Sequence, residues 1–104
     1  FLGGAYYRIP VIIDGVISAA AALIACRISP YARDFMLASH VSAEPAGALL
    51  LKELGLKPLI CAEMHLGEGT GGVMLLPLLD GALKVYGQAH RFDDIKLERY
   101  ERLI

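Results

Sequence analysis

The strongest constraint on the fold is a β-branched run that leads directly into an alanine-rich segment. Residues 9–15 read Ile-Pro-Val-Ile-Ile-Asp-Gly, which is typical of a buried strand in a parallel sheet. Residues 16–28 are rich in alanine and predict a buried helix, which the following Ser-Pro pair should end. Parallel strands are joined through such helices, so the start of the chain predicts an α/β unit.

The same strand-then-helix pattern follows a second time. Residues 34–40 predict another strand, and a helix is expected to start at Glu44 and Pro45 and to end at Gly55. Its apolar side should face the core through three leucines, Leu50, Leu51 and Leu54. We therefore predict an α/β fold that forms part of an open, mostly parallel Rossmann-like sheet flanked by helices.

The second half of the chain is less regular. Residues 58–66 fit either a strand or a helix. Residues 73–86 are apolar on nearly every side and predict a buried helix with Pro77 in its first turns. Charged side chains dominate the end of the chain, so we divide it into an α/β portion at 1–90 and a charged C-terminal tail at 91–104.

The apolar content is too high for an isolated small domain. Hydrophobic residues make up 56% of the 104 residues before the 11 glycines are counted, whereas ordinary domains reach about 45–50% with glycine included. A small domain cannot bury so much apolar surface within itself. We therefore expect a fragment whose apolar surface is covered by the missing N-terminal part of the same protein or by a second subunit, as in a homodimer.

Charge and hydropathy argue against two classes of partner. The net charge is −1 and the isoelectric point is about 6.3, so no basic surface for nucleic acid is expected. The longest apolar candidate, residues 16–25, is far shorter than the roughly 20 residues of a membrane-spanning helix. Two cysteines, Cys26 and Cys61, are too few for a disulfide scaffold. We expect a cytoplasmic protein with reduced thiols that binds neither nucleic acid nor membrane.

One carboxylate stands in a run of glycines. Residues 65–72 read His-Leu-Gly-Glu-Gly-Thr-Gly-Gly, and a strongly apolar segment follows them. Glycine admits backbone conformations with positive φ and lets a ligand come close. The carboxylate of Glu68, held there beside apolar side chains, could accept a proton from a bound molecule. The alternative is a solvated glutamate in an ordinary turn before a helix.

The glycine run also matches the dinucleotide-binding pattern Gly-x-Gly-x-x-Gly at Gly67, Gly69 and Gly72. That fingerprint requires a clear strand before it, and residues 58–66 do not clearly predict one. Glu68 would also lie beside the pyrophosphate, where a like charge is unfavourable. The pattern is therefore weak evidence for a dinucleotide site.

Polar residues follow the two predicted strands, where ligands bind in open α/β sheets. Asp14 and Gly15 come after the first strand, and Ser42 belongs to a polar loop at residues 39–44 after the second. Asp14 fits either a ligand contact or a cap on the helix that follows it. The loop holds serine, histidine and glutamate without the nucleophile motif of a hydrolase, so we interpret it as a hydrogen-bond donor to a ligand.

Cys61 and His65 are four residues apart and would share one face of a helix, as two zinc ligands can. A structural zinc site needs four ligands, and the sequence supplies no second pair. We therefore interpret Cys61 as a core cysteine and His65 as a hydrogen-bonded histidine, and we expect no metal site.

Four segments together resemble a known family. They are Ala-Ser-His-Val-Ser-Ala-Glu-Pro at 38–45, Leu-Gly-Leu-Lys-Pro-Leu at 54–59, Leu-Gly-Glu-Gly-Thr-Gly at 66–71 and Leu-Pro-Leu-Leu at 76–79. In this order and spacing they are similar to the C-terminal part of nicotinate-nucleotide:dimethylbenzimidazole phosphoribosyltransferase. The resemblance covers most of residues 8–86 and agrees with the interpretation as a fragment.

The resemblance implies a transferase of cobalamin assembly that needs no cofactor. Members of this family move phosphoribose from nicotinate mononucleotide to 5,6-dimethylbenzimidazole or a related base. The reaction gives α-ribazole phosphate and releases nicotinate. The resemblance also implies that these residues alone are inactive, because the family's main phosphate-binding segment lies upstream of them.

The resemblance also assigns roles to individual residues. Glu68 would be the catalytic base that takes a proton from the attacking benzimidazole. Residues of the same motif would contact the substrates, with the first two lining the aromatic pocket: Leu66, Gly67 and Gly69. Residues at the strand ends would lie beside the nucleotide and its phosphate: Asp14, Gly15 and Ser42.

Two other functions stay open from the residues themselves. One is a non-enzymatic nucleotide-binding α/β module that uses the turn at residues 67–72. The other is a structural interaction domain whose apolar face binds a partner. A benzimidazole bound beside Glu68 would favour the transferase, whereas a large buried interface without a formed pocket would favour the interaction domain.

Overall fold

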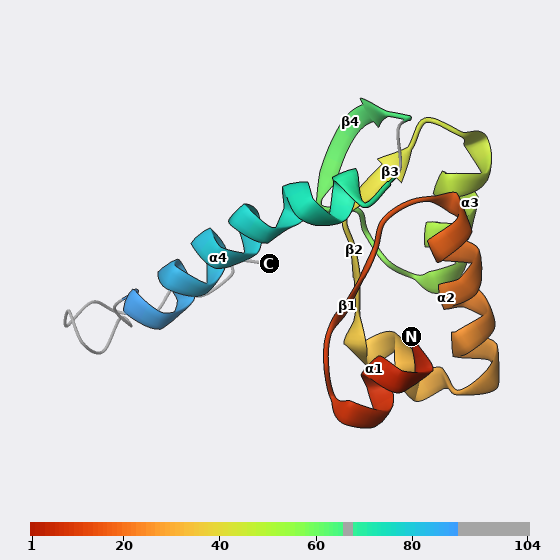
Figure 1. The fold of residues 1–104 in the computed structure, drawn as a ribbon, viewed down its shortest axis with the longest axis horizontal. Coiled ribbons are helices and arrows are strands. Elements are labelled where there is room, and N and C mark those ends of the chain that lie inside the picture. The colour runs from red at the N-terminus through yellow and green to blue at the C-terminus, as the bar shows by residue number, and fades with distance from the viewer. Residues whose placement is uncertain (66–67, 90–104) are drawn as a thin grey trace, which may run out of the picture.

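A computed structural model describes residues 1–65 and 68–89, in which strands and helices alternate (Figure 1). The helices are α1 (Leu2–Tyr7), α2 (Val16–Ile28), α3 (Pro45–Leu54) and α4 (Thr70–Gln88), with a 3-10 helix η1 (Pro30–Phe35) between α2 and the next strand. The strands are β1 (Val11–Ile13), β2 (Met36–Ala38), β3 (His40–Ser42) and β4 (Ile60–Met64). The predicted α/β fold is confirmed, while Leu66, Gly67 and the predicted tail at 91–104 lie outside the described residues.

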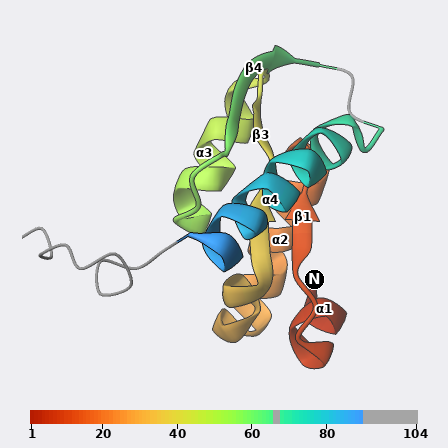
Figure 2. The same cartoon turned by 90° about the vertical axis from the view of Figure 1, so that its left-hand side faces the viewer.

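The strands are parallel, and residues 36–42 form their centre. β2 pairs with β1, and β3 pairs with β4; Figure 2 shows β1 and β4 on either side of this central segment. Ser39 joins the two pairs, because its N–H donates to the Ile13 carbonyl at 3.1 Å and its carbonyl accepts from the Ile60 N–H at 2.8 Å. The second strand was predicted to start at residue 34. It starts at Met36 instead, because the residues just before it belong to η1.

The edge strand β4 settles the ambiguity at residues 58–66. Ile60–Met64 is extended and pairs with β3, with an irregular register between His40 and Ser42. This segment is extended because it forms hydrogen bonds with the free edge of β3. The periodicity of the sequence does not show that such an edge is available. A clear strand therefore does precede the glycine turn, contrary to the expectation from sequence.

Helices α2 and α3 pack against each other on one side of the strands, and α4 starts on the other side (Figure 1). The bounds predicted for α2 are confirmed, and its buried face consists of small residues: Ala19, Ala22 and Ala25. Small side chains let two helices approach closely, so the leucines of α3 can fill the core. Leu51 and Leu54 are buried as predicted, and Leu50 is partly buried.

Residues 73–86 are helical as predicted, but the expectation that this helix is buried is wrong within the described residues. Within α4 only Gly71 and Leu75 are buried. Large apolar side chains are exposed along the rest: Val73, Met74, Leu76, Leu78, Leu83, Val85 and Tyr86. Only the first turns of α4 lie against the strands, and the helix then extends past them (Figure 1). Even so, no helix among the described residues is long and apolar enough to cross a bilayer.

The close contact of α2 with α3 leads to a stability prediction. Ala22 is fully buried, whereas its neighbour Ala21 is exposed. The substitution Ala22→Leu should lower the free energy of unfolding by about 1–3 kcal/mol, because the fully buried site has no space in the core for the added methylenes. Denaturant unfolding measures the change, and Ala21→Leu is the matched control that should leave it nearly unaltered. Equal effects of the two substitutions would contradict this packing of α2.

Candidate active site

A cleft of about 690 Å³ opens at the carboxyl ends of the strands. Asp14 and Gly15 follow β1, Ser42 ends β3, and Glu68 lies in the turn after β4. Three separate segments of the chain thus bring four of the predicted site residues to one cleft. Ligands of open α/β sheets bind at this edge because loops and helix N-termini converge there. His40 also borders the cleft.

Ser18 shapes the side of the cleft that α2 provides. Its Oγ accepts the Asp14 N–H at 2.9 Å and the Gly15 N–H at 2.8 Å, and it donates to the Gly15 carbonyl at 2.9 Å. These bonds hold the turn between β1 and α2, and Ser18 itself lines the cleft. Sequence reasoning missed Ser18, although a serine three residues after the glycine that starts a helix is a recognisable capping signal.

The carboxylate of Asp14 caps a helix, but not the one expected. Oδ2 accepts the Gly69 N–H at 3.1 Å and Oδ1 accepts the Gly72 N–H at 3.2 Å. Gly69 is the N-cap residue of α4 and has no side chain to offer. Asp14 therefore takes the place of an N-cap side chain from 55 residues away, where its negative charge also suits the helix dipole. The alternative that Asp14 caps α2 is wrong.

Glu68 stands in a strained turn at the mouth of the cleft. Its φ is 53° and that of Gly69 is 77°. Glycine adopts such angles freely, whereas a residue with a side chain loses about 1–2 kcal/mol there. The Glu68 side chain lines the cleft but is exposed. Apolar side chains such as Val16, Ile17 and Met64 line the same cleft, as expected, but they leave the Glu68 side chain open to solvent.

Ser42 presents a hydroxyl to the cleft. Its Oγ accepts the Glu44 N–H at 3.2 Å, which leaves the hydroxyl proton for a ligand, since a serine hydroxyl both donates and accepts. The predicted polar loop at residues 39–44 is wrong in part, because His40–Ser42 forms the strand β3. The role of this segment as a hydrogen-bond donor to a ligand stays a prediction.

A buried serine and histidine lie beneath the turn. Ser39 Oγ is 2.6 Å from the Ile13 carbonyl and 3.0 Å from His40 Nδ1. A hydroxyl has one proton, and the carbonyl can only accept it, so we infer that the His40 Nδ1–H donates to Ser39. Gly71 packs directly against this pair, and a Cβ there would overlap the imidazole ring and come within 2.8 Å of Ser39 Oγ. Glycine is therefore needed at this point of α4 for steric reasons.

Comparison with known proteins places this geometry in a family. A family profile described as phosphoribosyltransferase matches residues 1–96. The chain belongs to this phosphoribosyltransferase family. The resemblance seen in the sequence is thereby confirmed.

Relatives of known name cover nearly all of the chain. The nicotinate-nucleotide–dimethylbenzimidazole phosphoribosyltransferases of Ruminiclostridium cellulolyticum and Clostridium acetobutylicum are each 45% identical over 103 residues, which is 99% of this chain. The crystal structure of CobT from Thermus thermophilus is 37% identical with a TM-score of 0.84 and covers 95% of this chain. The match spans only 29% of the length of each of these proteins.

The charged side chains of the cleft include several carboxylates. Three carboxylates line it, those of Asp14, Glu44 and Glu68, and no lysine or arginine does so among the described residues. A nucleotide phosphate binds where cations or N–H groups face it. Among the described residues the cleft therefore offers an anion hydroxyls, N–H groups and the imidazoles of His40 and His65.

Cys61 and His65 do not form a metal site with other described residues. β4 is a strand, and Cys61 on it is exposed, so the interpretation as a core cysteine is wrong. In residues 1–65 and 68–89 no three side chains of histidine, cysteine, aspartate or glutamate gather closely enough to hold an ion.

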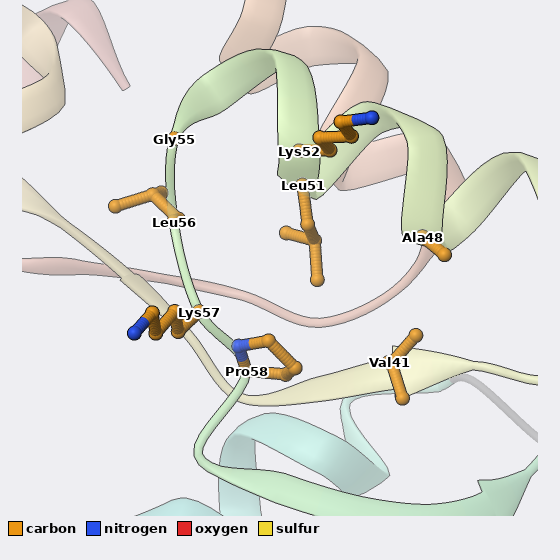
Figure 3. Close-up of a pocket in the computed structure, with 8 residues that line it drawn as sticks. All are labelled: Val41, Ala48, Leu51, Lys52, Gly55, Leu56, Lys57 and Pro58. Carbon is orange, nitrogen blue, oxygen red and sulfur yellow. The ribbon is translucent and has the colours of Figure 1, made fainter.

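A second hollow, of about 440 Å³, lies between α3, β3 and the segment that leads to β4 (Figure 3). Its centre is apolar, with Leu51, Pro58 and Val41 facing one another, while the amines of Lys52 and Lys57 point away from it and from each other. This hollow shares no residue with the cleft. Because it lacks converging polar groups, we assign the chemistry to the cleft.

The tight packing of Gly71 can be tested by comparing an alanine substitution there with the same substitution at the next residue. Gly71→Ala should lower the free energy of unfolding by about 1–3 kcal/mol, because the new methyl group must displace the His40 ring or the start of α4. Gly72→Ala is the matched control, since a Cβ there would only touch Ile12 Cγ2 at 3.8 Å. Alanine favours a helix over glycine by about 1 kcal/mol, so Gly72→Ala should be neutral or stabilising in denaturant unfolding. A stabilising Gly71→Ala would contradict the described packing.

Proposed function

We propose that this chain supplies the C-terminal part of the active site of a phosphoribosyl transferase of cobalamin assembly. The reaction moves phosphoribose from nicotinate mononucleotide to 5,6-dimethylbenzimidazole or a related base, giving α-ribazole phosphate and nicotinate. The observation that carries the proposal is the convergence of Asp14, Gly15, Ser42 and Glu68 on one cleft at the carboxyl ends of the strands. The names of the relatives support it.

In this proposal Glu68 is the general base. One nitrogen of the benzimidazole attacks the anomeric carbon of the ribose, and the bond from that carbon to the nicotinate nitrogen breaks with its electron pair going to nicotinate. The second benzimidazole nitrogen then gives its proton to the Glu68 carboxylate. Leu66 and Gly67 would line the pocket of the aromatic base, and Gly69 would contact a substrate. Such general-base help contributes about 10²–10⁴-fold in rate.

The two helix N-termini at the cleft suggest where the nucleotide phosphate lies. The first turn of α4 is already occupied by the Asp14 carboxylate, which would repel an anion. The first turn of α2 contains no acidic residue and directly follows the N-cap residue Gly15. A helix N-terminus that no carboxylate occupies attracts phosphate, so we place the phosphate near Gly15 and the Ser42 hydroxyl, and the aromatic base near Glu68.

The nucleotide-binding module is less well supported. Its turn does follow a strand, β4, so the objection raised from sequence no longer stands. However, a pyrophosphate on α4 would need the N–H groups of Gly69 and Gly72, and both donate to Asp14. The capped helix therefore argues against a dinucleotide at this turn.

A purely structural interaction domain would not require a cleft with converging polar groups. The exposed apolar face of α4 is compatible with the transferase, because the chain spans only 29% of its relatives. We propose that the missing N-terminal part or a second subunit of a homodimer covers this face and supplies the cations for the phosphate. We further propose a cytoplasmic location and no activity for the isolated chain.

The activity can be measured in a chimera that carries these 104 residues in place of the matching segment of the Ruminiclostridium cellulolyticum relative. The chimera should convert nicotinate mononucleotide and 5,6-dimethylbenzimidazole to α-ribazole phosphate, detected by chromatography. A chimera with the circular dichroism and thermal unfolding of the relative but no transfer would overturn the proposed function.

The role of Glu68 leads to the first prediction on this activity. Glu68→Gln in the chimera should lower kcat by about 10²–10⁴-fold, because an amide cannot take the proton. The shape and size of the side chain stay the same, so thermal unfolding should be unaffected. Wild-type turnover by the Glu68→Gln chimera would show that another group is the base.

The placement of the phosphate leads to a second prediction, which uses a matched pair at Gly15. A Cβ at this position would meet nothing within 4 Å, and asparagine and aspartate are equally good N-cap residues. Gly15→Asp should raise KM for nicotinate mononucleotide about tenfold above Gly15→Asn, because only the former adds a negative charge beside the phosphate. Equal KM values for the two variants would place the phosphate elsewhere.

A further inference from the structure

We propose that Asp14 is a positioning residue for catalysis, which holds the Glu68 carboxylate at its working position by capping α4 from the end of β1. This inference rests on the proposed function, because Asp14 acts through the base. It differs from the role implied by the resemblance, in which Asp14 lies beside the nucleotide.

The first support is the pair of hydrogen bonds that joins the end of β1 to the start of α4. Asp14 Oδ2 and Oδ1 accept the N–H groups of Gly69 and Gly72 at 3.1 and 3.2 Å. Gly69 directly follows Glu68 in the chain, so one of the two bonds acts on the residue next to the base. Both acceptor atoms belong to one carboxylate, which therefore fixes the orientation of the first turn as well as its distance.

The second support is the strained backbone of the base itself. Glu68 has a φ of 53° although it carries a side chain. A residue keeps such a conformation only when its surroundings impose it. β4 ends at Met64 on one side of the turn, and α4 begins at Thr70 on the other. The bonds from Asp14 are the described side-chain hydrogen bonds to the start of α4, and they hold this end together with the packing of Gly71 against His40.

The third support is that Asp14 is itself firmly placed. Its N–H donates to Ser18 Oγ at 2.9 Å, and it follows the last residue of the sheet strand β1. The parallel strand and α2 therefore form the fixed frame, and the glycine turn is fastened to it. A base that depends on such a frame is sensitive to small displacements, since a shift of about 1 Å can cost roughly 10²-fold in rate.

The test compares two substitutions of Asp14 in the chimera. Asp14→Ala removes both acceptors, and kcat should fall about 10–100-fold while KM for nicotinate mononucleotide changes less than about twofold. Asp14→Asn keeps one acceptor oxygen in the same shape, so its kcat should lie between those of the wild type and Asp14→Ala. If Asp14→Ala fails to fold, the test uses Asp14→Asn alone. In that variant kcat should again fall while KM for nicotinate mononucleotide changes less than about twofold.

A double-mutant cycle separates positioning from direct substrate binding. If Asp14 acts only through the base, adding Asp14→Ala to Glu68→Gln should lower kcat by less than about twofold, because the positioned group is already absent. A substrate contact by Asp14 would instead raise KM for the nucleotide on both backgrounds, and that result would overturn the inference. Asp34→Ala is the matched control, since Asp34 is an exposed aspartate of η1, away from the cleft.

The outcomes also separate this inference from the proposed function. An inactive Glu68→Gln chimera together with a fully active Asp14→Ala chimera would refute the positioning role and leave the proposed base in place. A fully active Glu68→Gln chimera would refute the base, and with it the positioning role of Asp14. Hydrogen exchange gives a readout apart from turnover, because Asp14→Ala should accelerate exchange of the Gly69 and Gly72 amides and Asp34→Ala should not.

Discussion

The buried hydroxyl of Ser39 is the contact on which the region around the cleft depends. It donates to the Ile13 carbonyl at 2.6 Å and accepts from His40 Nδ1, while the backbone of Ser39 bonds to both β1 and β4. A buried polar group left without a partner would cost about 1–3 kcal/mol. The end of β1, the start of β3 and the edge strand therefore keep one arrangement, and Gly71 lets α4 rest directly on it.

Two helices begin at this cleft, and only one of their N-termini is capped by a carboxylate. The first turn of α4 is neutralised by the carboxylate of Asp14, whereas the first turn of α2 holds no acidic residue and borders the cleft at Gly15. The electrostatic preference of a helix N-terminus for an anion is thus satisfied inside the protein at one helix and left for a ligand at the other. In the proposed function this difference gives the cleft a direction, with the phosphate at one end and the aromatic base at the other.

Much of the fold was predictable from residues that act locally. The alanine-rich stretch at 16–28 became α2 with the predicted bounds, and Gly55 ended α3 in a left-handed conformation. Predictions failed or stayed open where distant segments decide. β4 exists because β3 offers a free edge, and α4 is exposed beyond Leu75 because the described chain has nothing to cover it. Of the site, the glycine run and the strand ends were visible in sequence, but Ser18 was missed and the capping alternative for Asp14 named the wrong helix.

Side-chain type and spacing along the chain were enough to indicate most of the strands and helices, the residues able to do chemistry, and the family that they resemble. The folded chain was needed to show that Asp14 meets Gly69 and Gly72, that Ser39 bonds to two strands, and that Glu68 is held at a positive φ. The reason is physical. A hydrogen bond between residues 55 apart depends on how the intervening strands and helices stack, and no local pattern records that stacking.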